Sequence, residues 1–309
     1  DTMQGTKAMA RNWYLTGDER WARLYAAICR QILDTPASNA RGPMEWTFNT
    51  LEGWDLIDEC PALPDALKLE ILNRLLLIGV RNEQAYGRSV QSVSRPIVDG
   101  HQLDQGLCLY MHGAYFDRYY GINGHWKTMT EPLITLGEQT PRVHDSYAYG
   151  PIAGNDFLSE YALKSGDMDY FTNGNCLLQA RWQMLCTDNI NGGGTFGDDG
   201  AWRGSPPAGL LQKANWFYSD DTLKWFLQGL RPPLGAFAND RPAKLPTDLL
   251  GVAYIPLKGR LYDVAASTRK DPEAAKWPAE SVPPAKAFDK LSLRTGFTPQ
   301  DQYLLLDGI

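Results

Sequence analysis

The chain has 309 residues, of which 43% are hydrophobic and 21% charged. This proportion supports a large hydrophobic core and excludes an intrinsically disordered chain, and the length fits one large domain or two ordinary ones. The formal net charge of −6 excludes general nucleic-acid binding, which needs a basic surface. No apolar run reaches the roughly 18 residues that a membrane-spanning helix requires.

Helical periodicity fills most of the first 230 residues. Within 19–33 the apolar residues recur about every 3.6 positions, after a turn in which Gly17 ends one helix and Asp18 caps the next. Similar turn-forming residues occur at Ser165-Gly166-Asp167 and at Ser219-Asp220. We therefore expect helical hairpins with helices over 3–15, 19–33, 48–59, 64–85, 101–120, 125–138, 151–164, 168–186 and 221–229, and loops near 34–46, 86–100, 139–150 and 187–207.

The character of the sequence changes after about residue 230, where prolines interrupt any helical pattern. A polar, proline-rich segment covers 267–286, and the alternation in 288–295 and 302–307 predicts two paired strands. Two strands alone are marginal, so we expect the chain to be a fragment or to have lost the rest of a β domain. The five cysteines have no CxxC spacing, which favours buried free thiols, with one disulfide as the alternative.

His101 is the first candidate for chemistry, because it stands at the predicted start of a helix, in Asp99-Gly100-His101-Gln102. The positive end of the helix dipole favours a neutral imidazole, which can act as a base. Gln105 follows four residues later and shares a face with His101. The alternative interpretation is a histidine that caps or packs the helix.

The loop Arg142-Val143-His144-Asp145-Ser146-Tyr147-Ala148-Tyr149 is the second candidate. A tyrosine acts as a base only when a nearby cation lowers the pKa of its hydroxyl, and Arg142 offers such a cation. A tyrosine-rich loop that packs on the domain rim is the alternative.

A glycine-rich segment over 192–203 contains Asp198, Asp199 and Trp202, which can line a polar cleft or form a solvated turn. Trp46 and Trp54 are candidates for stacking on a sugar ring, although core packing explains them as well. With four histidines and no metal-binding motif, the sequence indicates no metal site within this stretch.

Several of these segments, in their order along the chain, resemble one known family. They are the Thr16-Gly17-Asp18 turn, Pro96-Ile97-Val98-Asp99-Gly100-His101-Gln102, the Asp145-to-Gly150 loop, Phe196-Gly197-Asp198, and the closing strands between Asp289 and Gly308. Together they look like the heparinase II/III-like and alginate-lyase-like polysaccharide lyases. The resemblance implies a mainly α fold: an (α/α) toroid of helical hairpins over 1–235, a linker with irregular or short-strand structure over 236–286, and the first strands of an antiparallel β-sandwich over 287–309.

The resemblance also implies β-elimination at a uronic acid. The C5 proton becomes removable once the neighbouring carboxylate is neutralised and the developing enolate is stabilised. Tyr147 or Tyr149 would be the base and acid, and His101 would assist or neutralise. Gly100 stands where the family commonly has Asn, and Gln102 or Gln105 is the candidate substitute. Accessory substrate-binding residues would be Arg142, His144, Trp46 and Trp202.

The implied partner is an acidic polysaccharide or oligosaccharide, with no nucleic acid and no membrane, and the implied location is secreted or periplasmic. No cofactor is expected in this segment, although a metal in the rest of the sandwich domain would be compatible with the family. Two alternatives stay open: a glycoside hydrolase that pairs Asp198 or Asp199 with Glu52 or Asp145, and a glycan-binding domain without catalysis.

Overall fold

A computed structural model describes residues 2–34, 45–91, 100–138, 155–193, 208–230, 238–257 and 284–308. Its contacts divide the chain into two compact units. The first contains the described residues before position 94 together with Asp104–Leu133. The second contains the start of the fifth helix up to Leu103 and the described residues from Ile134 onward. The predicted domain boundaries at 235 and 286 stay predictions.

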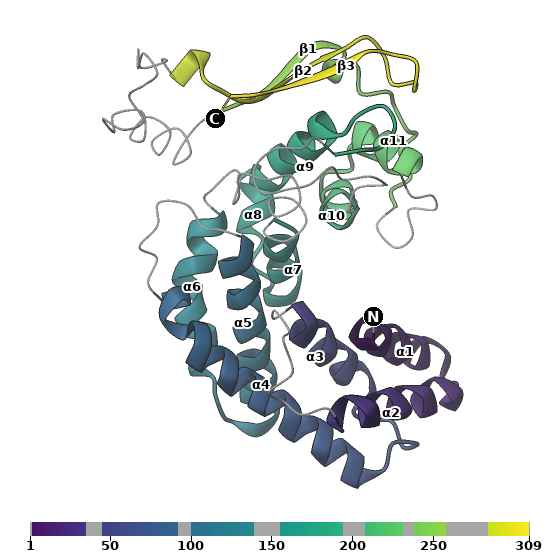
Figure 1. The fold of residues 1–309 in the computed structure, drawn as a ribbon, viewed down its shortest axis with the longest axis vertical. Helices are drawn as coiled ribbons and strands as arrows, with labels where there is room; N and C mark the ends of the chain where they lie inside the picture. Colours follow the sequence, from purple (N-terminus) through teal and green to yellow (C-terminus); the bar gives the residue numbers. More distant parts are fainter. Residues whose placement is uncertain are drawn as a thin grey trace. The chain divides into compact units, whose positions relative to one another are not determined.

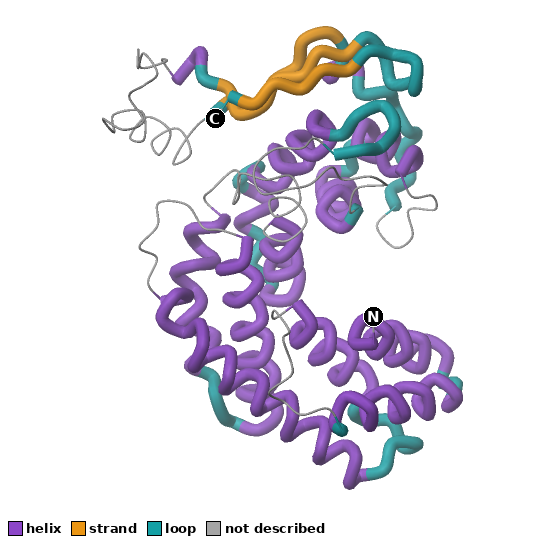
Figure 2. Tube along the Cα trace, viewed as in Figure 1, coloured by secondary structure: helices purple, strands orange, loops and turns teal. Residues whose placement is uncertain are grey.

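Helices make up the first unit (Figures 1 and 2). They are α1 (Thr2–Thr16), α2 (Glu19–Leu33), α3 (Glu45–Ile57), α4 (Asp65–Gln91), and most of α5 (Gly100–Tyr120) and α6 (His125–Glu138). Helix α1 packs against α2 and α3. Helix α6 lies against glycines of its neighbours: a Cβ at Gly79 of α4 would lie 2.5 Å from the Trp126 ring, and one at Gly106 of α5 would lie 2.8 Å from Leu133 Cδ2.

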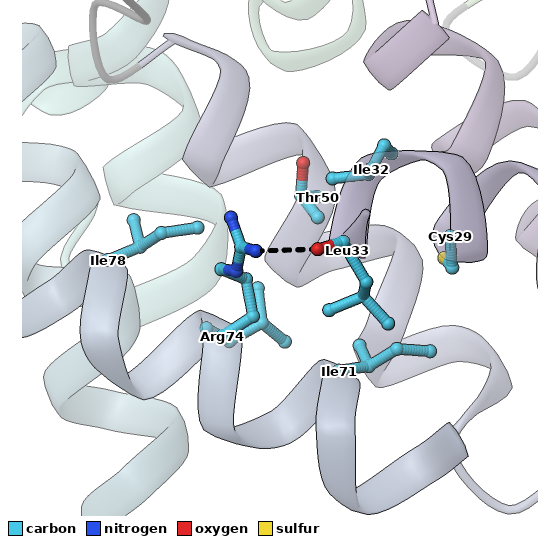
Figure 3. Close-up of a pocket in the computed structure, with 8 residues that line it drawn as sticks. Cys29, Ile32, Leu33, Thr50, Ile71, Arg74 and Ile78 are labelled. Atoms are coloured by element: carbon cyan, nitrogen blue, oxygen red, sulfur yellow. Dashed lines mark hydrogen bonds between the residues drawn. The ribbon is translucent and has the colours of Figure 1, made fainter. Parts of the chain in front are cut away.

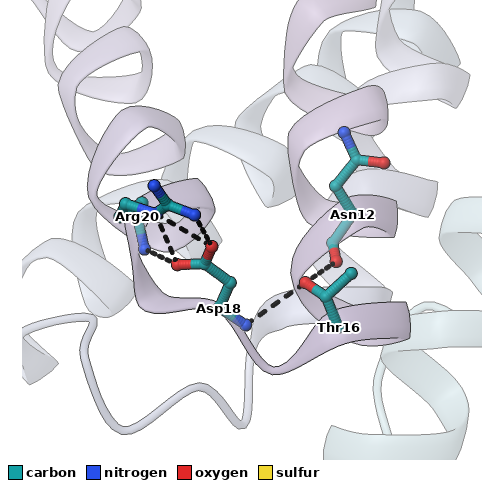
Figure 4. A network of polar contacts seen from close by, with 4 residues as sticks. All are labelled: Asn12, Thr16, Asp18 and Arg20. Carbon is teal, nitrogen blue, oxygen red and sulfur yellow. Dashed lines mark hydrogen bonds and ion pairs between the residues drawn. The ribbon is translucent and has the colours of Figure 1, made fainter.

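The predicted turn between α1 and α2 is confirmed (Figure 4). Gly17 has a φ of 66°, and its N–H donates to the Trp13 carbonyl over 2.7 Å, which ends α1. Asp18 Oδ1 accepts from the Arg20 backbone N–H over 2.9 Å, and the Arg20 guanidinium also binds this carboxylate. The Thr16 hydroxyl donates to the Asn12 carbonyl over 2.6 Å. Local side-chain chemistry therefore sets both helix ends.

Short helices form most of the second unit. They are α7 (Asn155–Ser165), α8 (Asp169–Thr172), α9 (Asn175–Cys186), α10 (Gly209–Tyr218) and α11 (Asp221–Leu230). The turn at Gly166 repeats the α1–α2 pattern, with a φ of 82° and the Ser165 hydroxyl donating to the Tyr161 carbonyl. The predicted continuous helix over 168–186 is wrong, because Gly174 adopts a φ of 81° and separates α8 from α9.

A three-stranded antiparallel sheet follows, in the order β1 (Gly251–Pro256), β2 (Phe288–Arg294) and β3 (Tyr303–Asp307). The predicted strand pair corresponds to β2 and β3, and β1 adds a third strand within the region expected to be irregular or short-strand. Strands β1 and β2 pack against α9. Buried Ala253, Ile255 and Ser292 belong to the covered face.

All five cysteines are buried and free, as the spacing predicted. Burial raises the pKa of Cys29 to about 11, so this thiol stays protonated at neutral pH. These cysteines therefore contribute as small apolar core residues rather than as nucleophiles or cross-links.

Candidate functional site

Most of the predicted site residues lie outside the described part of the chain. This is true of Arg142, His144, Tyr147, Tyr149 and Trp202, and also of Asp145, Asp198 and Asp199. The backbones of His101 and Gln102 lie in the first turn of α5, and that of Trp46 lies in the first turn of α3. Gln105 is half-buried one turn further along α5. The catalytic and substrate-binding roles of these residues stay predictions.

The described residues do show where the predicted segments are anchored. Gly137, at the end of α6, lies against two leucines: a Cβ there would be 3.1 Å from Leu103 Cδ2 and 3.1 Å from Leu158 Cδ2. Leu103 is in the first turn of α5 and Leu158 is in the first turn of α7. The two ends of segment 139–154, which contains both candidate tyrosines, are therefore anchored beside the helix start that carries His101.

A second anchor joins the starts of α7 and α10. Lys213 is 3% exposed, and its Nζ lies 2.6 Å from Asp156 Oδ1 and 2.7 Å from Glu160 Oε1. Gly209 allows this approach, since a Cβ there would lie 2.6 Å from Asp156 Oδ2. Burial lowers the pKa of Lys213, but the two carboxylates outweigh burial and hold that pKa above its ordinary value. The start of α10, which follows segment 194–207 in the sequence, therefore lies beside α7.

Glu138, the last residue of α6, adds an ionisable group at this junction. Its backbone carbonyl accepts from Asn173 Nδ2 over 2.9 Å and from Asn175 Nδ2 over 2.6 Å. Burial, together with Asp167 and Asp169, raises the pKa of the Glu138 carboxyl to about 7. Among the described residues, its Oε1 has no hydrogen-bond partner. A carboxyl with this pKa exchanges its proton near neutrality.

Sequence reasoning missed the Lys213 cluster and Glu138, although one signal was present. Lys213 is the one charged residue of helix Gly209–Tyr218, and Asp156 and Glu160 are spaced four residues apart on one helix face. A lone lysine on an apolar face together with such a carboxylate pair indicates a buried ion pair. Which helices meet, however, is a tertiary property.

Trp54 and Glu52, which the sequence analysis singled out, have structural contacts, and so does His112. His112 is fully buried, with Nδ1 2.8 Å from the Cys108 carbonyl, so Nδ1 carries the proton and donates. Burial lowers the pKa of His112 to about 4, which keeps it neutral. Trp54 is 3% exposed and donates to the Tyr115 hydroxyl over 2.6 Å, so it is a core residue. Glu52 forms an ion pair with Lys7 within the first unit.

An apolar cavity in the first unit is too small for a sugar (Figure 3). Its volume is about 20 Å³, which is room for about one water. The Arg74 guanidinium donates to the Leu33 carbonyl over 3.0 Å and satisfies the end of α2. The cavity is lined by Cys29, Ile32, Leu33, Thr50, Ile71, Arg74, Leu75 and Ile78. This arrangement is a packing gap between helices.

The described residues contain no group of three or more His, Cys, Asp or Glu side chains placed to hold a metal ion. In the same part of the chain, none of the helices combines the length and the apolar character that crossing a bilayer requires.

Comparison with known proteins shows a solved structure with a similar fold. No family model matches the sequence, and no curated protein matches it. Among solved structures, the chain is similar to the crystal structure of heparinase III, with a TM-score of 0.55 and 12% sequence identity. The match covers 97% of this chain and 43% of that one, so the chain spans less than half the length of the structure it matches. The chain therefore has a fold similar to that of heparinase III, which confirms the predicted mainly α toroid followed by the start of an antiparallel β domain.

Proposed function

We propose that this protein is a polysaccharide lyase that cleaves a uronic-acid-containing polysaccharide by β-elimination. The observation that carries the proposal is the contact of Gly137 with Leu103 and Leu158, which anchors segment 139–154 beside the start of α5. A mechanism with His101 and Tyr147 or Tyr149 needs their two segments to start from neighbouring helix ends, and this contact supports it in that respect. The fold shared with a heparinase supports the same activity class.

The proposed chemistry divides the work between two groups. Tyr147 or Tyr149 removes the C5 proton and returns a proton to the leaving glycosidic oxygen, while His101 assists or neutralises the uronate carboxylate. Gln102 or Gln105 replaces the family asparagine at Gly100 as a hydrogen-bond donor to that carboxylate. Preorganised donors at the developing enolate contribute most of the rate acceleration in such reactions. Arg142, His144, Trp46 and Trp202 bind the neighbouring parts of the chain.

The proposed substrate is an acidic polysaccharide, and the protein is proposed to act outside the cytoplasm, where such polymers occur. The hydrolase alternative is less well supported where it uses Glu52, because that carboxylate is paired with Lys7. The two activities differ in their products. A lyase leaves an unsaturated sugar end that absorbs ultraviolet light, and a hydrolase does not.

The test is an ultraviolet assay on heparin-like chains, alginate and other uronates. Activity should fall by at least ~100-fold in Tyr147→Phe/Tyr149→Phe, since loss of a general base costs about 10²- to 10⁴-fold. Full activity in this double variant would refute the tyrosine assignment. His101→Gln should also be strongly impaired.

Matched controls separate chemistry from folding. Tyr14→Phe changes a tyrosine that is 65% exposed on α1, and it should leave the rate unchanged. His125→Gln changes a largely exposed histidine that pairs with Glu83, and it should also be neutral. Sugar binding without any unsaturated product would favour a glycan-binding domain instead.

A further inference from the structure

Three asparagines of this chain precede a glycine: Asn123, Asn173 and Asn191. An asparagine in this position can lose its side-chain amide without an enzyme, because the backbone nitrogen of the next residue attacks the side-chain carbonyl carbon. Glycine lacks a Cβ and therefore hinders this attack less than any other residue. All three pairs lie among the described residues, so their hydrogen bonds show which of them is held back from reaction.

The pair Asn173-Gly174, between α8 and α9, is held at both reacting groups. Asn173 Nδ2 donates to the Glu138 carbonyl over 2.9 Å, and Asn173 Oδ1 accepts from the Asn175 N–H over 2.9 Å. The Gly174 N–H donates to the Phe171 carbonyl over 3.2 Å. Attack on the Asn173 side chain therefore requires local opening of these contacts.

The pair Asn191-Gly192, in the turn after α9, is held at the attacking nitrogen. The Gly192 N–H donates to Asp188 Oδ1 over 2.6 Å, and Gly192 is buried. Thr187 and Gly193 form an antiparallel bridge that closes this turn. The Gly192 nitrogen must break its bond to the carboxylate before it can attack, and the closed turn opposes that movement.

The pair Asn123-Gly124 lies in the turn that joins α5 to α6 (Figure 1). Asn123 has a φ of 56°, a conformation that asparagine adopts more readily than most residues. Two carbonyls of this turn bind the start of α6: that of Asn123 accepts from the Trp126 N–H and that of Gly124 from the Lys127 N–H, each over 3.1 Å. Within the described part of the chain, however, neither the Asn123 side-chain amide nor the Gly124 N–H has a hydrogen-bond partner. Both residues are half-buried, so water reaches them.

We propose that Asn123 is a site of spontaneous deamidation, and that its isoaspartate product loosens the start of α6. The Gly124 nitrogen forms a bond to Asn123 Cγ, the bond from Cγ to Nδ2 breaks, and Nδ2 leaves as ammonia with the proton of the Gly124 N–H. Water then opens the resulting succinimide at one of its two carbonyls, which leaves aspartate or isoaspartate at position 123. Water is the one co-reactant. This inference does not depend on the proposed lyase function.

The two products differ in their effect on the turn. Aspartate keeps the backbone and places a negative charge before the N-terminus of α6, which the helix dipole favours. Isoaspartate leads the backbone through Cβ and adds one carbon to it. The carbonyl that accepts from the Trp126 N–H then belongs to a side group rather than to the backbone, so the first turn of α6 should open more easily.

The first experiment compares the three pairs within one protein. The whole chain is incubated at mildly alkaline pH, which speeds the reaction, and is then cleaved with trypsin. Peptides 119–127, 165–181 and 182–203 each contain one of the pairs, and mass spectrometry with fragmentation measures the loss of each side-chain amide. In the folded protein Asn123 should deamidate at least ~10-fold faster than Asn173 and Asn191, because those two need local opening. In urea the three rates should agree within about 3-fold, since the unfolded chain keeps few of these contacts.

Two variants test the assigned cause. Asp188→Ala removes the acceptor of the Gly192 N–H and should raise the rate at Asn191 at least ~5-fold, with no change at Asn123. Asn123→Gly tolerates the positive φ and should abolish the modification of peptide 119–127. Equal rates at the three pairs of the folded wild type, or a faster reaction at Asn173 or Asn191, would overturn the inference whether or not the variants fold.

The second experiment measures the effect on α6 by hydrogen exchange. The deamidated protein contains both products, whereas Asn123→Asp contains the aspartate alone and carries the same charge. The Trp126 and Lys127 amides should exchange at least ~5-fold faster in the isoaspartate fraction of the deamidated protein than in Asn123→Asp. Equal exchange in the two proteins would refute the loosening of α6.

Discussion

Glu138 shows how a single buried carboxyl can make stability depend on pH. The residue is 6% exposed at the end of α6, and its pKa is raised to about 7 by burial and by Asp167 and Asp169. In the unfolded chain the carboxyl titrates near its ordinary value of 4.5. Between these two pH values the folded protein binds more protons than the unfolded one, so stability falls as pH rises from about 4.5 to 7.

We predict that Glu138→Gln removes this pH dependence. Above pH 7 the variant should be more stable than the wild type by about 1–2 kcal/mol, after allowance for partial solvent screening of the carboxylate. Near pH 4.5 the two proteins should be equally stable. Thermal unfolding at pH 5, 6, 7 and 8 measures the difference.

Glu131→Gln is the control for this prediction, because it makes the same change at an exposed position of α6. Its stability should differ from that of the wild type by less than about 0.5 kcal/mol, as is usual for surface substitutions. The interpretation of Glu138 would be wrong if the difference between Glu138→Gln and the wild type were the same at pH 5 and pH 8.

At the scale of elements, glycines determine how closely helices of the first unit approach. Gly79 of α4 faces the Trp126 ring of α6, which is fully buried, and the Cβ of an alanine would lie 2.5 Å from it. Trp126 has no exposed surface toward which it can shift. We predict that Gly79→Ala destabilises the protein by about 2–3 kcal/mol through overpacking, despite the better helix propensity of alanine.

Gly229→Ala, in a helix of the second unit, is expected to change the stability in the opposite direction. A Cβ at Gly229 of α11 meets nothing within 4 Å, so the substitution should stabilise by up to about 1 kcal/mol. Urea denaturation of both variants measures the two signs. Equal effects at the two positions would mean that packing against Trp126 is not the cause.

The ion-pair cluster of Lys213, Asp156 and Glu160 joins α7 to α10. Lys213→Met leaves two partly buried carboxylates without their cation, and we predict a loss of about 2–4 kcal/mol. Lys127→Met removes a pair of the same length, 2.6 Å to Asp117, but with both side chains at least one third exposed. This control should cost less than about 1 kcal/mol. Similar losses in urea denaturation would contradict the assigned difference in burial.

The helices and their turns were predictable because their signals are local. Periodicity marks the helices, and the Gly17-Asp18 turn caps its neighbours through residues next to it in sequence. The break at Gly174 had a local signal, a glycine between Asn173 and Asn175, but the helical periodicity on both sides led to the prediction of one continuous helix. The distant contact at this break, in which the amides of Asn173 and Asn175 reach the Glu138 carbonyl, could not be predicted from the sequence.

At the scale of the whole molecule, the sequence predicted which segments carry chemistry but not what anchors them. The order of the motifs led to the fold class that the similarity to heparinase III confirms. Some contacts depend on how helices and strands pack. Examples are those of Gly137 with Leu103 and Leu158, and that of Arg294 with the Thr187 carbonyl. Apolar residues and a lone arginine carry no information about their partners. For this reason the sequence predicts Arg294 only as part of a strand.

The sheet has one apolar face that the described residues leave open. Cross-strand pairing forms two rows on this face, Val252–Leu293–Leu304 and Tyr254–Leu291–Leu306. Five of these six residues are 38–63% exposed, while the opposite face packs against α9. The covered face also carries Lys290, Ser292 and Arg294, so the open face is the more apolar of the two. Exposed apolar patches of this kind bind other apolar surfaces.

We predict that this face dominates the binding of a hydrophobic fluorescent dye by the 309-residue chain. Leu293→Thr/Leu304→Thr removes two of the three apolar side chains of one row and introduces β-branched residues, which suit a strand. The dye signal should therefore fall by about half or more with unchanged secondary structure. Ile190→Thr is the control, because Ile190 is a 70% exposed apolar residue that lies in the turn after α9 and not in these rows. Dye fluorescence and circular dichroism measure the outcome. An equal fall in both variants, or none in the double variant, would show that the open face is not the apolar surface that the dye detects.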